Sequence, residues 1–180
     1  MVRRLIALAA CAGAVAVPMA AKAQDAYFGP QIGFFFPSSA AMRDALGDSW
    51  FSFGASRIRI FDVNQAKWSH DWSAINQRRD GNSIFILTGS MGYAYPLSAG
   101  TEKYKPYFAI RGGISYIDYA ITTGGGRKAG KRFGLNGNTA IGVNIDRRIN
   151  IEARYDVFSA QDGLSFDGLT LYLRVGIARF

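Results

Sequence analysis

Two adjoining stretches of the chain alternate apolar and polar residues with a period of two, and this pattern confines them to β structure. In residues 135–145 most of the apolar side chains share one parity, while asparagine and glycine dominate the other. After a short turn at 146–148, residues 149–157 repeat the alternation, with two acids, an arginine and an asparagine on the polar parity. Successive side chains of a strand point to opposite faces, so the two stretches predict a long β-hairpin with one apolar and one polar face.

The same pattern recurs along the chain and predicts eight strands. We expect them near 26–36, 50–61, 67–77, 83–95, 105–120, 133–146, 148–159 and 168–180. Strands of ~10 residues or more suit a tilted membrane-spanning strand better than a typical globular one. Aromatic residues gather toward the strand ends, as in the girdles of membrane barrels. The sequence therefore predicts an all-β fold, an eight-stranded antiparallel up-and-down transmembrane β-barrel.

The first 23 residues have the parts of a secretory signal peptide. Arg3 and Arg4 precede an apolar stretch, and residues 21–23 form a small-x-small cleavage site. We therefore expect 1–23 to be removed and 24–180 to form a single barrel domain in the outer membrane of a Gram-negative (diderm) bacterium. A competing lipoprotein site at Cys11 would leave only six apolar residues after Arg4, so it is the less favoured alternative.

An even number of strands puts both chain ends on one side of the membrane, the periplasmic side. Residues 62–66, 96–104 and 146–148 are then periplasmic turns, and 37–49, 78–82, 122–132 and 160–167 are external loops. In the first loop, Ser38 or Ser39 can cap a short helix that Gly47 would end. This helix could plug the barrel or recognise a partner, but covering the barrel rim is the favoured expectation. The Asp-Gly pair at 80–81 predicts a tight hairpin.

The run GLNGNTAIGVNIDRRINIEARYDVF, the opening AYFGPQIGFFFPSS and the final strand ending in an aromatic resemble small bacterial outer-membrane barrels of the OmpA-transmembrane, OmpX and OmpW kind. The resemblance covers essentially all of the chain after the signal. It implies insertion by the barrel-assembly machinery, with Phe180 as the C-terminal assembly signal. Phe180 is out of phase with Ile177, which predicts either a β-bulge near Ala178-Arg179 or an aromatic at the lumen mouth.

With the apolar parity facing lipid, the polar parity predicts a charged lumen. The residues expected there are Arg57, Arg59, Asp71, Arg111, Glu152, Arg154, Asp156 and Arg174. Charges in so narrow a barrel must pair, and eight strands leave room for side chains or one small ligand. A structural salt-bridge network is therefore favoured over a conduction pathway. Its surplus of five arginines over three acids would favour anions if water entered.

A glycine-rich stretch, 124–132, is expected to be a flexible cationic external loop carrying Arg127, Lys128, Lys131 and Arg132. It resembles a phosphate-binding loop, but Arg132 stands where Ser or Thr is needed and no helix follows. Nucleotide and nucleic-acid binding are therefore not expected. The functional hypothesis is attraction to lipopolysaccharide phosphates or to another acidic surface.

Enzymatic chemistry would have to use Ser69, His70 and Asp71, which are consecutive and therefore alternate across the strand. Outer-membrane lipid A deacylases place a His and a Ser two apart, whereas here Trp68 and Trp72 occupy those positions around His70. We therefore expect no catalytic residue, and the sequence also offers no cluster suited to a metal or cofactor.

Three functions follow from these patterns. The favoured one is a non-enzymatic, monomeric outer-membrane barrel with an envelope structural or surface-interaction role, or narrow passage of a small solute, in contact with outer-membrane lipid and lipopolysaccharide. The alternatives are a deacylase-like outer-membrane lipid-modifying enzyme and a soluble periplasmic lipocalin-like carrier. The carrier would require an apolar lumen and a charged exterior, the reverse of the observed parity.

Overall fold

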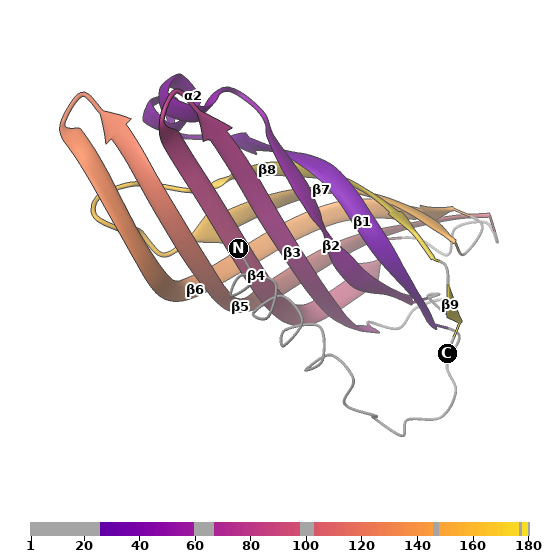
Figure 1. Cartoon of the computed structure of the whole chain (residues 1–180). Helices are drawn as coiled ribbons and strands as arrows, with labels where there is room; N and C mark the ends of the chain where they lie inside the picture. The colour runs from indigo at the N-terminus through magenta and orange to yellow at the C-terminus, as the bar shows by residue number, and fades with distance from the viewer. Residues whose placement is uncertain (1–25, 60–66, 98–102, 146–147, 177, 180) are drawn as a thin grey trace.

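The computed structural model describes residues 26–59, 67–97, 103–145, 148–176 and 178–179, which form an antiparallel sheet closed into a barrel (Figure 1). The eight long strands are β1 (Ala26–Pro37), β2 (Trp50–Arg59), β3 (Lys67–Arg79), β4 (Asn82–Pro96), β5 (Tyr104–Thr123), β6 (Gly126–Ile145), β7 (Ile149–Phe158) and β8 (Gly168–Val175). A helix, α2 (Ala40–Leu46), joins β1 to β2, and a short β9 (Ala178–Arg179) follows β8. The predicted eight-stranded antiparallel up-and-down barrel is confirmed.

The barrel closes through β1, which pairs with β2 on one side and with β8 on the other. Gln31, for example, lies opposite Gly54 of β2 and opposite Arg174 of β8. From β2 to β8, consecutive strands pair with each other, and β9 pairs with β1. Closure gives the main-chain groups of β1 and β8 partners that an open sheet would leave exposed at its edges.

Side chains alternate between the two faces of the barrel wall as the sequence predicts. Along β7, exposed and buried residues alternate without exception from Ile149 to Phe158. The outer face carries an apolar belt of exposed side chains: Ile141, Ile149, Ile151, Leu171, Leu173 and Val175. An apolar exterior contradicts the lipocalin-like alternative, whose outer surface would have to be polar.

The β5–β6 hairpin is longer than the sequence pattern predicted. Each strand has 20 residues, and pairing continues from Tyr104 opposite Ile145 to Thr123 opposite Gly126. The expected external loop at 122–132 is therefore wrong, because most of it is the first half of β6. Pairing of β6 with β7 stops at Asn136, so the hairpin projects beyond the strands on that side (Figure 1).

The helix predicted in the first external loop is present as α2. Ser39 stands at its N-cap, although its side chain makes no capping hydrogen bond. Gly47 ends the helix with a φ of 90°, a conformation that glycine adopts without strain. Within the described residues, no helix is both long enough and apolar enough to cross a membrane.

The tight Asp-Gly hairpin between β3 and β4 is also confirmed. Asp80 and Gly81 have φ values of 48° and 76°, and the flanking Arg79 and Asn82 pair directly. Positive φ at both central residues matches the right-handed twist of the strands that the turn connects.

Replacing Gly81 with alanine should therefore lower the free energy of unfolding by about 1 kcal/mol, because a Cβ disfavours positive φ. An added Cβ would meet no atom within 4 Å, so only the backbone conformation is tested. Urea unfolding of the barrel in detergent measures the change. The matched control is Gly124→Ala in the β5–β6 turn, where the space is also open and φ is not positive. If Gly81→Ala and Gly124→Ala lower the free energy of unfolding equally, the positive φ of Gly81 is not the cause of the loss.

A β-bulge separates β8 from β9. Gln31 lies opposite Arg174, whereas Phe28 lies opposite Ala178, so the register between β1 and the end of the chain shifts by one position. This shift is a β-bulge, one of the two possibilities that the sequence predicted at this end. Phe180, the expected assembly signal, lies outside the described residues.

Candidate functional site

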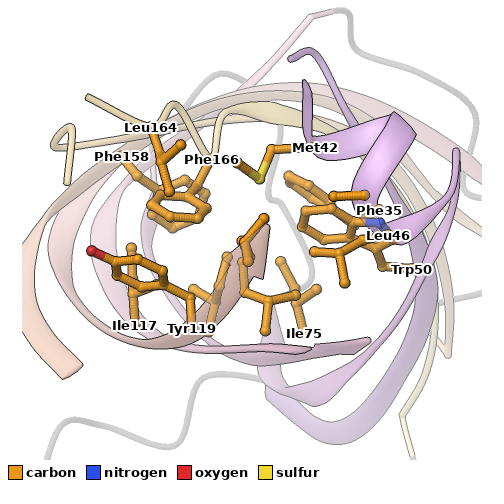
Figure 2. Close-up of a cluster of buried hydrophobic side chains, with 14 residues drawn as sticks. Phe35, Met42, Leu46, Trp50, Ile75, Ile117, Tyr119, Phe158, Leu164 and Phe166 are labelled. Carbon is orange, nitrogen blue, oxygen red and sulfur yellow. The ribbon is translucent and has the colours of Figure 1, made fainter. Parts of the chain in front are cut away.

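The interior of the barrel contains two layers of side chains, and the layer at the α2 end is apolar. Figure 2 shows side chains of this layer meeting across the barrel mouth. They come from α2, from six strands and from the β7–β8 connection. We call them the apolar plug: Phe35, Met42, Ala45, Leu46, Trp50, Ile75, Ile84, Ile86, Ile117, Tyr119, Ile121, Phe158, Leu164 and Phe166. Of the two roles expected for the helix, covering the rim and plugging the barrel, the structure shows the second, because Met42 and Leu46 are fully buried inside the barrel.

Three side chains hold the end of α2 against the wall. Gln77 donates to the carbonyl of Leu46 at 2.8 Å, and Asn82 donates to the carbonyl of Ala45 at 3.1 Å. The Trp50 indole donates to the carbonyl of Gly47 at 2.9 Å. These bonds satisfy carbonyls that a helix C-terminus leaves without partners, so α2 is an integral part of the closed barrel.

The second layer, nearer the middle of the barrel, is a charge network of six residues contributed by β3, β5, β7 and β8. At most 5% of each residue is exposed. The members are Asp71, Arg111, Glu152, Arg154, Asp156 and Arg174. All six are among the residues that the polar parity predicted for the lumen.

Glu152 binds two guanidinium groups at once. Arg174 reaches its two carboxylate oxygens at 2.7 and 2.9 Å, and Arg111 reaches the same oxygens at 3.2 and 2.8 Å. Arg174 also donates to Asp71 at 3.2 Å. Two-point contacts between an arginine and a carboxylate are among the strongest hydrogen bonds in proteins, so Glu152 ties β5, β7 and β8 together.

Arg154 joins the remaining acids. Its guanidinium donates to Asp71 at 2.5 Å and to Asp156 at 3.0 Å, and it also donates to the Tyr172 hydroxyl at 2.9 Å. The guanidinium lies 4.5 Å from the centre of the Tyr172 ring. Thr170 donates to the Asp156 oxygen that Arg154 uses, at 2.9 Å. These contacts compensate a cation that has no access to water.

Two further residues, Arg57 and Arg59, were also predicted to line the lumen. Both belong to β2, but their side chains lie outside the part of the chain that the structure describes. Their place in the lumen therefore stays a prediction.

Without them the charge network holds three arginines and three acids. The surplus of cations on which an anion preference would rest is therefore absent from the six described charges. Opposite charges in equal number, paired at short distance, form a neutral structural core rather than a path lined by one sign of charge.

Sequence reasoning missed the uncharged partners of the network. The Gln31 amide oxygen accepts a hydrogen bond from Arg174 at 2.5 Å, and Tyr172 contacts both Arg154 and, through its hydroxyl, Ser52 at 2.7 Å. Both Gln31 and Tyr172 lie on the inward parity, so the signal that identified the charged residues could have identified them too.

Tyr107 closes the network on the side opposite the plug. Its hydroxyl donates to Glu152 at 2.6 Å. The ring passes over Gly142 on the neighbouring strand, where an added Cβ would lie 2.5 Å from it. Glycine is required at position 142 because the tyrosine occupies the space of a side chain.

The four cations expected in an external loop lie on β6 and divide between its faces. Lys131 forms an ion pair of 3.4 Å with Asp118, its cross-strand partner on β5. Lys128 and Arg132, on the other parity, contact Asp162 of the β7–β8 connection. Arg127 shares the parity of Lys131 and is exposed. These cations therefore belong to a paired strand and not to a flexible loop, and their external position stays a prediction.

The consecutive residues Ser69, His70 and Asp71 do not converge. Ser69 and Asp71 point inward, where Ser69 accepts a hydrogen bond from Arg111 at 3.0 Å. The His70 ring packs edge-on against Trp68, with ring centres 6.4 Å apart. Their arrangement is not that of a nucleophile with its base.

Comparison with known proteins supports the fold. No protein-family model matches the chain, and no curated protein matches it. Among solved structures, the outer-membrane enzyme PagL has a TM-score of 0.57 at 12% identity, over 83% of this chain and 99% of that chain. The attachment invasion locus protein Ail of Yersinia pestis, solved with the heparin analogue sucrose octasulfate, has a TM-score of 0.54 at 14% identity, over 87% and 99%. Neisserial surface protein A has a TM-score of 0.51 at 15% identity, over 85% and 97%.

At these identities the likeness concerns the fold alone. The chain has the fold of the small eight-stranded outer-membrane β-barrels, the class that its sequence resembles. The neighbours include an enzyme and surface proteins, so the fold by itself does not choose between their roles.

Proposed function

We propose that the protein is a closed, non-enzymatic outer-membrane barrel with a structural and surface-interaction role in the bacterial envelope, and that it passes no solute. The observation that carries this proposal is the filled interior. The apolar plug occupies the outer mouth, and the charge network crosses the barrel beneath it. Solute passage would require displacing α2 and separating short ion pairs in a region without water to replace their contacts.

Several features support placement in the outer membrane. The apolar belt is suited to lipid, and solved structures of similar fold include a protein described as an outer-membrane enzyme. We further propose that residues 1–23 direct export and are then removed, that the barrel-assembly machinery inserts the protein through Phe180, and that the protein is a monomer. The deacylase-like alternative gains no support from Ser69, His70 and Asp71, which lie apart in two environments.

The outer end of the β5–β6 hairpin is the part that we assign to surface interaction. It presents Arg127, Lys128, Lys131 and Arg132 beyond Asn136, where the pairing of β6 with β7 ends. A dense group of cations attracts phosphate or sulfate groups, which lipopolysaccharide and acidic glycans both carry. Ail, of similar fold, was solved with a sulfated heparin analogue, which is consistent with such a role for this end of the barrel.

A conductance measurement tests the closed barrel. The purified mature protein should migrate differently on a denaturing gel before and after boiling, as a folded barrel does, yet give no current steps in a planar bilayer. A porin inserted in the same bilayer shows that steps would be detected. Discrete steps from this protein would contradict the proposal and indicate a narrow channel.

A further inference from the structure

The β7–β8 connection places one acidic residue among donors of the β5–β6 hairpin. The carboxylate of Asp162 accepts a hydrogen bond from the Tyr119 hydroxyl and another from Arg132 at 3.1 Å. Lys128 donates to the main-chain carbonyl of the same aspartate at 2.9 Å. Three donors from two strands therefore converge on one residue that is 43 positions from Tyr119 in sequence.

The base of this connection is fixed, whereas the contacts of Asp162 are close to water. Gln161 and Leu164 bond to each other through their main chains at 2.8 and 3.3 Å, and Leu164 belongs to the apolar plug. The side chains of Arg132 and Asp162 remain 55% and 36% exposed. An ion pair with this exposure contributes little free energy, so a ligand with more negative charge can replace the Asp162 carboxylate.

The charge of the hairpin is not balanced by its own acids. The hairpin end carries four cations, Arg127, Lys128, Lys131 and Arg132, and among the described residues the acids that contact this group are Asp118 and Asp162, which leaves a net charge of 4 − 2 = +2. A phosphate or sulfate group offers more oxygens than a carboxylate and can accept two parallel bonds from an arginine. Its charge also matches the excess on the hairpin.

We propose that Tyr119, Lys128 and Arg132 form an anion site for a phosphate or sulfate group, and that Asp162 occupies this site until such a group displaces it. This inference rests on the proposed contact between the hairpin and anionic ligands, and it adds that the protein carries its own competitor. Asp162 therefore sets the affinity of the site and restricts it to ligands that bind better than a single carboxylate.

The faces of β6 indicate how a ligand reaches the site. Lys128 and Arg132 share the inward parity of Asn136, whereas Lys131 pairs on the other face with Asp118. The anion site consequently lies on the side of the hairpin that continues the barrel interior, above the apolar plug. The lipid around the barrel contacts the opposite, outward face of the hairpin. A glycan in solution is therefore favoured over a neighbouring lipid head group as the ligand of the anion site.

The central experiment compares pyrophosphate binding by the wild-type protein and by the variant Asp162→Asn, both folded in a non-ionic detergent and titrated by calorimetry. Asparagine tolerates the φ of 51° found at this position. Removing the competing carboxylate should tighten pyrophosphate binding about fivefold, the size of effect expected from one exposed ion pair. The added variant Arg132→Ala should abolish this gain, because it removes the arginine of the site.

Asp80→Asn is the matched control. Asp80 also stands at positive φ in an Asp-Gly turn at the outer end, and it pairs with Arg79 at 3.3 Å, but no tyrosine or lysine is recorded on its carboxylate. It changes the net charge of the protein by the same amount as Asp162→Asn. Equal affinities of the two variants for pyrophosphate would overturn the inference. That result would not affect the proposal of a closed barrel, because only current steps in the conductance measurement would contradict that proposal.

A second arm distinguishes the source of the anion. The wild-type protein and Asp162→Asn are each placed in vesicles containing either intact lipopolysaccharide or lipopolysaccharide stripped of its phosphates, and pyrophosphate binding is measured again. Equal binding in the two vesicles supports the site with a ligand from solution. Weaker binding in the intact vesicles supports the site with a lipid phosphate as its occupant. Loss of the fivefold gain in both vesicles would overturn the proposal.

Discussion

Replacing Arg154 with alanine should destabilise the folded barrel by about 3–5 kcal/mol, the usual result of removing one member of a buried charge network. Arg154 is 1% exposed and is the cation that contacts both Asp71 and Asp156. Without it, Asp156 loses its charged partner inside the barrel. Arg174 still contacts Asp71, so the larger share of the cost falls on Asp156.

Urea unfolding followed by tryptophan fluorescence measures this effect, because Trp50 is fully buried in the plug. The control is Arg79→Ala, which removes an exposed arginine paired with Asp80 at 3.3 Å and should cost less than about 1 kcal/mol. Adding Asp156→Asn to Arg154→Ala should recover part of the loss by removing the stranded charge. An unchanged unfolding midpoint for Arg154→Ala would show that the network does not stabilise the fold.

Leu173→Arg should prevent stable insertion of the barrel in a membrane. Leu173 lies on the outer face, 43% exposed, between Ile32 of β1 and Ile151 of β7. A cation on the lipid face costs about 2–4 kcal/mol at the middle of the bilayer. The heat-dependent shift in gel mobility reports the fraction of folded barrel after refolding into lipid vesicles.

The matched control is Ala129→Arg, which places the same side chain on the outward parity of β6 within the projecting hairpin. Position 129 lies between Arg127 and Lys131 on that parity and is exposed, so water surrounds an added cation there. This variant should insert normally. If Leu173→Arg inserts as well as Ala129→Arg, the outer belt does not face lipid.

Much of the fold follows from alternation, which is a local property of the chain. The faces of β7 and β8 could be predicted because each apolar residue is followed by a polar one, and a regular strand turns them to opposite sides. The Asp80-Gly81 turn was likewise predictable, since its residues tolerate positive φ. These elements depend on neighbours in sequence.

The error at β6 arises because the end of a strand depends on its partner. The first half of β6 has the composition of a loop, rich in glycine and cations, yet it pairs with β5 residue by residue. Cross-strand partners, such as Asp118 for Lys131, stabilise what local propensity does not.

The sequence by itself determined that the chain forms long strands with one apolar and one polar face. It also determined that the six residues of the charge network lie inside the barrel. Only the tertiary structure decided which charges meet, because Asp71 and Arg154 are 83 residues apart and their contact depends on the register of the closed barrel. It also decided that α2 fills the mouth and that Asp162 reaches the hairpin. Contacts of this kind are set by barrel closure, a property of the whole sheet that no local stretch of sequence contains.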